Sequence, residues 1–497
     1  MITDAQYAAW LASSDAIRTT LAEATCYSSG VAVTRYLSSK GYTTGAADTP
    51  ANTAYLPIML PGFQTTESIS LVSEGSFNAG ELAMSNGDGA LDSWLNDIWI
   101  NCPVKVWVGD IRWARSDFRM IFNGVTSNNI QVRDRSSLSL IIRDKLQMLN
   151  TPVTDLKLGG STPNADSLIP VPLGECHNPT PLLSNPVSLE YTVASGPVEA
   201  IFEVRDNGKP VTATVDNSSG KFNLTASPAG AITCSLQGVK VGDTYLNTIA
   251  SLIKALVTSY GKTTGIYASA PPFTVADIDV ANFAAFDAQF PQPVGLWLDS
   301  RTTLLDACAQ LASSVGAQMV PSRGGLLRLI QFAFPTTATT DILVSDQADH
   351  TLTPVDRTDP VASVKVAYCR NYTVQSGLLT SIPAQHKDLF AKDWLSRSAS
   401  DPAVQAAYKL NVDAIQQETC LLVGSDATVE AGRRLLRDKV VRTTYRFEGT
   451  PTQVLLVLGQ PVKLYSSRFG LSAGKVGILS SLTINWANLH VTVEVTI

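Results

Sequence analysis

Charged side chains are scarce in this chain. Asp, Glu, Lys and Arg make up 16% of the 497 residues, against about 25% in typical soluble domains. Ser, Thr, Asn, Gln and Ala therefore have to cover much of the surface. Such a composition disfavours both long solvent-exposed helices and intrinsic disorder. It favours a mainly β protein, with much of its surface buried in an assembly.

An excess of positive charge is also lacking. The chain has 37 basic and 43 acidic side chains, a formal net charge of −6. A protein that recognises nucleic acid by sequence normally carries a basic excess, because its lysines and arginines neutralise phosphates. This class of function is therefore disfavoured.

Long uncharged apolar runs are absent. The most apolar stretch, residues 249–257, is interrupted by Lys254, and about 18 apolar residues are needed to span a membrane. The N-terminal segment has Asp4 and no basic residue before Arg18, unlike a secretory signal. We therefore expect a soluble cytosolic product without a membrane segment, and about three or four domains for this length.

Neither cysteine nor histidine occurs at metal-ligand spacing. The closest two of the seven cysteines, Cys369 and Cys420, are 51 positions apart. Cys176-His177 is the one close Cys/His pair, and it lies in a Pro-rich stretch. We predict no metal site and no cofactor. Convergence of cysteines in space on an iron–sulfur cluster stays open as the less favoured alternative. The cysteines are Cys26, Cys102, Cys176, Cys234, Cys308, Cys369 and Cys420.

No set of residues points to catalysis. The zinc-helix pattern HExxH is absent, and residues 470–475 have three residues between their glycines where a phosphate-binding loop needs four. Val476 also stands where that loop would have its Ser or Thr, so we expect a turn. The carboxylate pairs Asp92/Asp97 and Asp277/Asp279 lie in no recognisable sugar groove. We therefore predict no catalytic, cofactor-binding or metal-binding residue.

The charges that are present are segregated along the chain. Three basic residues face ten acids in the first hundred positions, a local net charge of −7. A basic run begins within a helix predicted over residues 425–440 and extends beyond its end. In this helix we expect Leu435 and Leu436 to face inward and the basic side chains to face outward. This run is either a solvated helix face or a contact with an acidic surface of a neighbouring subunit. Its members are Arg433, Arg434, Arg437, Lys439, Arg442 and Arg446.

Local patterns predict the secondary structure. Thr3 and Gln6 have capping-box spacing, and residues 17–27 and 31–37 are typical of strands. Asp88 is a candidate N-cap for a helix carrying the apolar stripe Leu91, Trp94, Leu95, Ile98 and Trp99. Further helices are predicted at residues 248–260 and after a cap at Ser300. A hairpin is predicted around residues 322–325.

These elements suggest five segments. We predict an N-terminal β-barrel-type domain (1–150), a linker rich in Pro, Gly and Asn (151–186), a small β module (187–240), an α/β helix-hairpin domain (241–335) and a C-terminal β-barrel-type domain with an inserted helix (336–497). The expected fold class is mainly β with an α/β insert (α+β), with two tube-type β-barrel domains joined by smaller modules.

Three stretches resemble one known family in the same order along the chain. Residues 86–95 with 99–110 (NGDGALDSWL, WINCPVKVWVGD) resemble the N-terminal region of bacteriophage tail-tip and baseplate hub proteins. Residues 303–312, 316–320 and 324–329 (TLLDACAQLA, GAQMV, GGLLRL) are similar to the helix and hairpin of such hubs. Residues 458–464 and 468–471 (LGQPVKL, RFGL) resemble their final β-barrel.

This resemblance implies a structural role in the virion. In such hubs two related barrels from each of three chains form a pseudo-sixfold ring, which joins the tail tube to a central fibre. The implied partners are two further copies of the chain, the distal tail protein, the tape-measure protein, the central tail fibre and other tail-tip proteins. DNA would pass only in transit through the lumen. The chain would be assembled in the host cytoplasm and reside at the tail tip or baseplate.

Two other function classes remain open. Tail-tip chains can also carry domains that degrade cell wall or capsule, so a tail-associated enzyme is the main alternative. A β-rich carbohydrate-binding module is the third. Lysis of peptidoglycan would identify the enzyme, and glycan binding without an assembly partner would identify the module.

Overall fold

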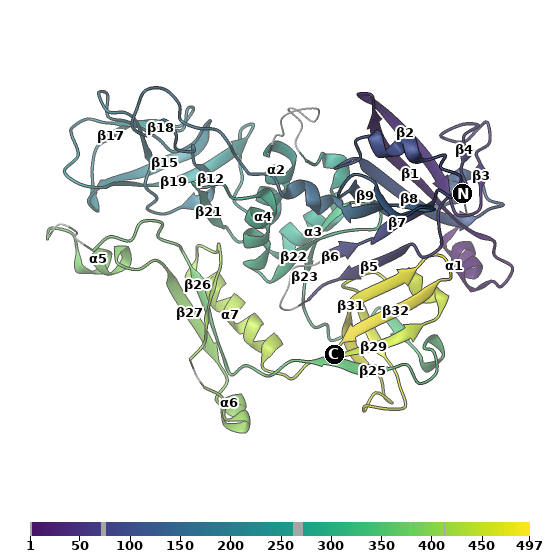
Figure 1. The fold of residues 1–497 in the computed structure, drawn as a ribbon. Helices are drawn as coiled ribbons and strands as arrows, with labels where there is room; N and C mark the ends of the chain where they lie inside the picture. The colour runs from purple at the N-terminus through teal and green to yellow at the C-terminus, as the bar shows by residue number, and fades with distance from the viewer. Residues whose placement is uncertain (1, 71–75, 262–271, 377, 379, 412) are drawn as a thin grey trace. The chain divides into compact units, whose positions relative to one another are not determined.

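A computed structural model describes residues 2–70, 76–261, 272–376, 378, 380–411 and 413–497 (Figure 1). The chain divides into two compact units, each built from segments that are distant in sequence. Unit 1 comprises residues 1–148, 318–358 and 441–497. Unit 2 comprises residues 149–317 and 359–440.

Unit 1 contains two main sheets. The first has the strand order β10-β11-β9-β8-β1-β2, with β7 beside β11, and the second has the order β24-β30-β31-β32-β29-β25, with β5 beside β31 and β6 beside β5. Its elements are α1 (Asp4–Ala12), β1 (Arg18–Ser28), β2 (Val31–Ser38), β3 (Tyr42–Thr43), β4 (Ala54–Tyr55), β5 (Gln64–Ser68), β6 (Ser76–Asn78), β7 (Glu81–Ser85), β8 (Pro103–Asp110), β9 (Arg119–Thr126), β10 (Gln131–Asp134), β11 (Ser137–Asp144), β22 (Ala317–Pro321), β23 (Leu327–Gln331), β24 (Thr340–Ile342), β25 (Thr353–Arg357), β29 (Thr443–Gly449), β30 (Pro461–Leu464), β31 (Lys475–Asn485) and β32 (His490–Thr496).

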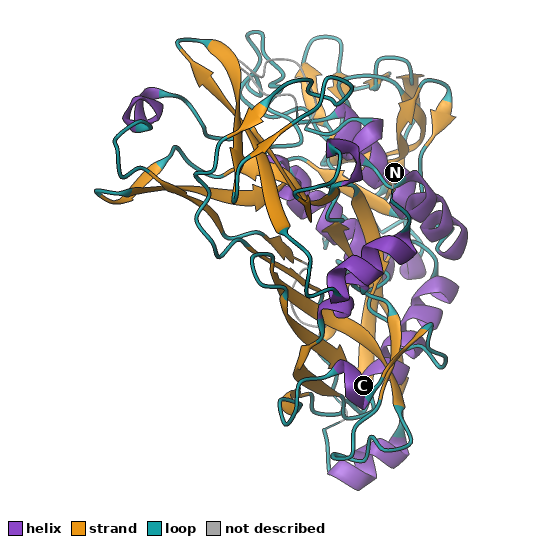
Figure 2. Cartoon of the chain, turned by 90° about the vertical axis from the view of Figure 1, so that its right-hand side faces the viewer, coloured by secondary structure: helices purple, strands orange, loops and turns teal. Residues whose placement is uncertain are grey.

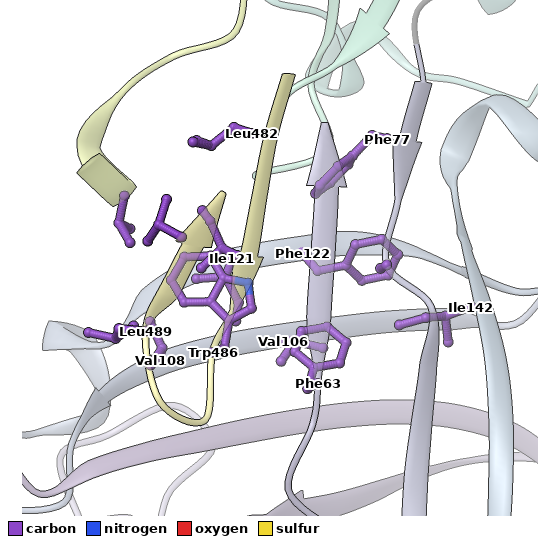
Figure 3. Close-up of a cluster of buried hydrophobic side chains, with 14 of the residues drawn as sticks. Phe63, Phe77, Val106, Val108, Ile121, Phe122, Ile142, Leu482, Trp486 and Leu489 are labelled. Atoms are coloured by element: carbon purple, nitrogen blue, oxygen red, sulfur yellow. The ribbon is translucent and has the colours of Figure 1, made fainter. Parts of the chain in front are cut away.

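One hydrophobic core lies between these two sheets. Strand β5 pairs with the C-terminal strand β31, and Trp486 Nε1 donates to Thr65 Oγ1 at 2.8 Å. Figure 3 shows Trp486 within the same cluster as Ile121 and Phe122. The predicted N- and C-terminal domains, residues 1–150 and 336–497, are thus not separate bodies. Strands β5 and β6 from residues 1–150 complete the sheet formed by residues 336–358 and 441–497, whereas residues 359–440 belong to unit 2. The two sheets of unit 1 pack together because either sheet alone would leave an apolar face in water.

The described residues of unit 2 form three smaller sheets and most of the helices. The strand orders are β16-β15-β19-β12-β21 with β20 beside β19, then β13-β14-β18-β17, and β27-β26-β28. Its elements are β12 (Val171–Cys176), β13 (Leu182–Asn185), β14 (Glu190–Thr192), β15 (Val198–Asp206), β16 (Lys209–Pro210), β17 (Ala213–Asp216), β18 (Lys221–Leu224), β19 (Ile232–Val241), β20 (Thr244–Tyr245), α2 (Ile249–Ser259), α3 (Val280–Gln289), β21 (Gly295–Leu298), α4 (Leu304–Ser313), β26 (Ser363–Tyr368), α5 (Ala384–Phe390), β27 (Leu395–Ser400), α6 (Pro402–Tyr408), β28 (Gln416–Glu418) and α7 (Gly424–Asp438).

The segment predicted as a linker is part of this unit. Residues 151–186 contain β12, which lies between β19 and β21, and also β13. Pro and Gly content predicted a linker here, but one of these glycines, Gly174, lies inside β12. Its φ is +62°, and an added Cβ would lie 1.8 Å from the carbonyl oxygen of Val294. This glycine marks close strand packing and not a loop.

Several local predictions are confirmed. The capping box of α1 joins Thr3 and Gln6, and the helix predicted over residues 248–260 is present as α2. The hairpin of β22 and β23 turns through residues 322–325, and α7 occupies the predicted basic stretch. The cap of α4 is Thr303 and not Ser300, since Thr303 Oγ1 accepts from the backbone nitrogen of Asp306.

The fold class is mainly β with added helices, as predicted (Figure 2). Among the residues described, no helix is both long and apolar enough to cross a bilayer.

Candidate functional site

The basic run that begins in α7 is a candidate contact surface for assembly. Arg434 does not face solvent: it is 7% exposed and lies against the end of α4. Its guanidinium donates to the carbonyl oxygens of Ser313 and Ser314, at 2.8 and 3.3 Å, and to Glu430 Oε1 at 2.5 Å. The predicted outward orientation of Arg434 is therefore wrong. The last carbonyls of α4 lack helical partners, and this arginine satisfies them.

The other basic side chains are also engaged within their own units. Arg433 and Arg437 form ion pairs with Glu430 and Asp438, and Lys439 pairs with Asp401. Arg446 pairs with Glu494, and the Arg442 guanidinium lies 3.7 Å from the ring centre of Phe334. Leu436, which was expected to face inward, is 63% exposed. Most side chains of the basic run thus form contacts within the chain, and few of their charges are left unpaired for an acidic partner.

The stripe predicted around Trp94 has a different structure from the one expected. Residues 92–96 form a single 3-10 turn, and Asp88 Oδ1 accepts from the nitrogen of Ala90 instead of capping an α-helix. The Asn86 side chain holds the segment that leads into this turn. Its Nδ2 donates to Asp92 Oδ1 at 2.8 Å, and its Oδ1 accepts from the nitrogen of Leu91 at 2.9 Å. The expected continuous apolar face is consequently split in two.

One part of the split stripe is held firmly inside unit 1. Trp94 and Trp99 are 6% and 0% exposed, and Trp99 Nε1 donates to the carbonyl oxygen of Trp94 at 3.0 Å. Asp97, which is also buried, accepts from Arg35 Nη2 at 3.0 Å, and the same guanidinium lies 5.0 Å from the Trp94 ring centre. These contacts fix the backbone of residues 94–99.

The other part faces outward. Leu95, Ile98 and Ile100 are 42%, 46% and 45% exposed. The backbone of Ile98 pairs with Tyr27 of β1, and Tyr27 in turn is opposite Ala32 of β2. Residues directly opposite one another across strands share a face. We call the exposed set Leu95, Ile98, Ile100 and Ala32 the Ile98 rim.

Unit 2 contains a cavity of about 310 Å³. Its wall combines the sheet of β15 and β19 with residues of the segment 369–395. Arg205 of β15 lies here, with its guanidinium 5.1 Å from the ring centre of Phe390 and in an ion pair with Glu203. Burial lowers the pKa of Arg205, and the Glu203 charge opposes this effect. The other polar residues in the wall include His177, Asn178, Ser235, Asn371, His386 and Lys392.

Two buried asparagines hold this wall together. Asn178 Nδ2 donates to Asn371 Oδ1 at 2.8 Å and to the carbonyl oxygen of Thr373 at 2.9 Å. Asn371 Nδ2 in turn donates to the carbonyl oxygens of Phe390 and Lys392, both at 2.9 Å. Asn178 Oδ1 is buried without a hydrogen-bond partner. The two residues are 193 positions apart, so no sequence pattern indicated this site.

The cysteines behave as small apolar side chains. Six are buried, and Cys369 is partly exposed. Burial raises the pKa of the Cys234 thiol to about 12 and that of Cys420 to about 11. Cys176 is buried, whereas the neighbouring His177 is half-buried and its Nε2 lies 3.2 Å from Glu175 Oε1. Within the described ranges, no group of three or more His, Cys, Asp or Glu side chains is arranged to hold a metal ion. The absence of a cofactor stays a prediction.

The segment 470–474 forms a turn. The nitrogens of Leu471 and Gly474 donate to the carbonyl oxygens of Arg468 and Leu471, at 3.1 and 2.9 Å. These residues also match the Gly-x-Ser-x-Gly pattern of hydrolase nucleophiles, which requires a strand before the serine and a helix after it. Here the segment leads from β30 directly into β31, so Ser472 is a turn residue.

Comparison with known proteins gives distant structural similarity. No protein-family model matches the chain, and no curated protein matches it in sequence. The 43 kDa tail protein of prophage MuSo2 from Shewanella oneidensis aligns over 96% of this chain and 98% of its own, with 12% identity and a TM-score of 0.41. A tail protein from Neisseria meningitidis MC58 covers 96% of both chains, with 10% identity and a TM-score of 0.38. A prophage tail protein from Listeria monocytogenes EGD-e covers 90% of this chain and 93% of its own, with 9% identity and a TM-score of 0.38. The chain thus aligns with these tail proteins over most of its length. Because the sequence identities and TM-scores are low, the function has to be argued from the chain's own residues.

Proposed function

We propose that this chain is a structural, non-enzymatic hub subunit of a phage tail tip or baseplate. Three copies form a ring that joins the tail tube and distal tail protein to the central fibre. The ring leaves a lumen for the tape-measure protein and, later, for DNA. The chain is assembled in the host cytoplasm and resides in the virion. The order of the three family-like stretches along the sequence supports this assignment.

The Ile98 rim is the observation that carries the proposal furthest. Leu95, Ile98 and Ile100 are aliphatic, substantially exposed and held on a backbone fixed by Trp94 and Trp99. Scattered exposed aliphatic residues are ordinary, but a group on a rigid segment indicates a surface that another protein covers. Burial of such side chains stabilises an assembly by about 25 cal/mol per Å² of apolar area removed from water.

The low charge content has the same explanation. A surface that is covered by neighbouring subunits has no need of the charges that keep a free protein soluble. The basic run of α7 fits this reading as well, because its charges are used for internal pairing and not for solvation.

Purified tails provide the test. Quantitative mass spectrometry of tails that contain this chain should give three copies per tail, in a fixed ratio to the tube protein. The isolated chain should leave peptidoglycan intact in a zymogram. A stable single copy per tail would contradict the hub, and clear lysis by the isolated chain would favour the enzyme.

A further inference from the structure

A second cavity, of about 210 Å³, lies within unit 1. It forms where the start of β1 meets the loop before β5 and the turn between β31 and β32. The Ile98 rim is no part of its wall. Pockets for drug-sized ligands usually have volumes of about 300–1,000 Å³, so this cavity has room for a ligand of about the size of one amino-acid residue.

The cavity is lined by two cations and by no carboxylate. Arg18 and Lys40 belong to its wall, which contains no Asp or Glu among the residues that the structure describes. Neither cation has an ion-pair partner within the described ranges. They are two of the three basic residues in the first hundred positions, where acids number ten. Positive charges that gather without a counter-ion in an otherwise acidic region attract an anion.

The Arg18 guanidinium has one nitrogen left for a ligand. Its Nη2 donates to the carbonyl oxygens of Leu11 and Ser13 at the end of α1, both at 3.0 Å. Its Nε is enclosed without a partner and is therefore out of a ligand's reach. Its Nη1 has no hydrogen-bond partner in the part of the chain that the structure describes, and it is not enclosed. Nη1 is thus the donor that this side chain presents to the cavity.

Thr20 supplies a second donor. It lies two positions after Arg18 on β1, so the two side chains share a face of the strand. Its backbone is fixed, because its nitrogen donates to Ser39 Oγ and its carbonyl oxygen accepts from the nitrogen of Ser39, both at 3.0 Å. Thr20 is only 6% exposed, yet its hydroxyl is not enclosed and makes no hydrogen bond with any described residue. Such a hydroxyl is available to a ligand in the cavity.

The rest of the wall is mainly apolar. Phe63 and Trp486 belong both to this wall and to the core cluster of Figure 3. Leu60 and Pro61 line the same cavity and are more exposed. An inorganic anion would leave these apolar groups against water, whereas an aliphatic group beside the anion covers them. The ligand that fits both parts of the wall is therefore a carboxylate with an apolar group next to it.

We propose that this cavity binds the C-terminal residue of a partner polypeptide that ends in an apolar side chain. The terminal carboxylate accepts from Arg18 Nη1 and the Thr20 hydroxyl beside the charge of Lys40, and the side chain lies against Leu60 and Pro61. An internal acidic residue fits less well, because consecutive side chains of an extended chain point to opposite faces and its apolar neighbour would point away. The site holds whether or not the chain is a hub.

Small probes separate the carboxylate from the apolar group. Isothermal titration and saturation-transfer NMR of the full chain should show saturable millimolar binding of N-acetyl-L-leucine, which has both. N-Acetyl-L-leucinamide lacks the carboxylate and N-acetylglycine lacks the side chain, and each should bind at least about fivefold more weakly. Inorganic phosphate should not compete with N-acetyl-L-leucine.

Thr20→Val locates the binding, because it removes only a hydroxyl that has no partner among the described residues. The variant should keep the thermal midpoint of the wild type and bind N-acetyl-L-leucine about fivefold more weakly, as expected for one lost hydrogen bond. Lys40→Gln should weaken the same binding about threefold and leave N-acetyl-L-leucinamide binding unchanged. Lys105→Gln is the matched control, since Lys105 is exposed on β8 and does not line the cavity.

The proposal is overturned if N-acetyl-L-leucine does not bind saturably, if phosphate or the amide binds as well as N-acetyl-L-leucine, or if either Thr20→Val or Lys40→Gln binds it like the wild type. These outcomes leave the proposed hub untouched, because the cavity and the Ile98 rim share no residue.

Discussion

Arg434 Nη2 donates to the carbonyl oxygen of Ser313 at a distance of 2.8 Å, and this bond joins two helices whose residues are 121 positions apart. Ser313 is the last residue of α4, where the main-chain carbonyls have no helical partner. The guanidinium also pairs with Glu430 one turn earlier on α7. A side chain that was expected on the solvent side of a basic helix is therefore the main polar link between α7 and α4.

Arg434→Met should destabilise unit 2 strongly. The substitution leaves Glu430, which is 5% exposed, with Arg433 alone and leaves the Ser313 carbonyl unpaired. Removal of one partner of a buried pair costs about 3–5 kcal/mol. Because Arg433 still pairs with Glu430, we expect a loss of about 3 kcal/mol. Thermal unfolding and hydrogen exchange at the end of α4 measure the effect. The matched control is Arg301→Met, which breaks an exposed pair with Asp155 and should cost less than about 1 kcal/mol. Equal effects of the two variants would contradict this role.

Asp110→Asn should destabilise unit 1 in a pH-dependent way. Asp110 is fully buried and accepts from Trp10 Nε1 at 3.0 Å, from the nitrogen of Ile17 at 2.9 Å and from Arg112 Nε at 2.6 Å. The Arg112 guanidinium holds the pKa of this carboxyl well below its usual range. At neutral pH we expect a loss of about 2 kcal/mol, because charge-assisted hydrogen bonds disappear.

The sign of the pH dependence follows from the lowered pKa. A carboxylate with a lowered folded-state pKa stabilises the fold above the unfolded-state pKa of about 3.9, and this contribution is lost as the pH falls below that value. The difference in unfolding free energy between wild type and Asp110→Asn should therefore be constant from about pH 7 to pH 5 and shrink below about pH 4. Denaturant titrations across that range measure it. A difference that stays constant at low pH would show that the carboxylate charge is unimportant.

Gly325→Ala should cost more than a positive φ alone explains. Gly325 has a φ of +79°, and an added Cβ would lie 2.8 Å from the carbonyl oxygen of Asn123. Gly30 has a φ of +81° with nothing within 4 Å of its Cβ position, so Gly30→Ala isolates the backbone cost of about 1–2 kcal/mol. Gly325→Ala should exceed Gly30→Ala by at least about 1 kcal/mol in thermal unfolding, since two backbone segments have to separate. Similar losses would mean that the Asn123 segment yields easily.

Features governed by neighbouring residues were predictable from the sequence. The capping box of Thr3 and Gln6 and the hairpin turn at residues 322–325 both depend on contacts within a few positions. The mainly β character follows from composition and alternation in the same way. Such local preferences agree with the tertiary fold at these places.

Features that join distant segments were not predictable. The pairing of Thr66 with Thr483 links residues 417 positions apart, and no local signal marks it. The prediction therefore separated two domains that share one core. The cavity wall is a similar case, because Asn178 and Asn371 meet only in the fold. At the stripe around Trp94, the apolar residues have helical spacing, but the local hydrogen bond of Asn86 to Asp92 and the ion pair of Asp97 with the distant Arg35 accompany a different backbone conformation.

The most direct test of the assembly account is the mass of the chain in solution before and after the Ile98 rim is altered. Sedimentation of the wild type should give three copies of the 53.0 kDa chain. Ile98→Asp should give a single chain with an unchanged thermal midpoint, because Ile98 is 46% exposed. Val187→Asp, at a position that is 93% exposed outside the rim, should still give three copies. A single chain for the wild type at every concentration, or three copies for Ile98→Asp, would contradict the account.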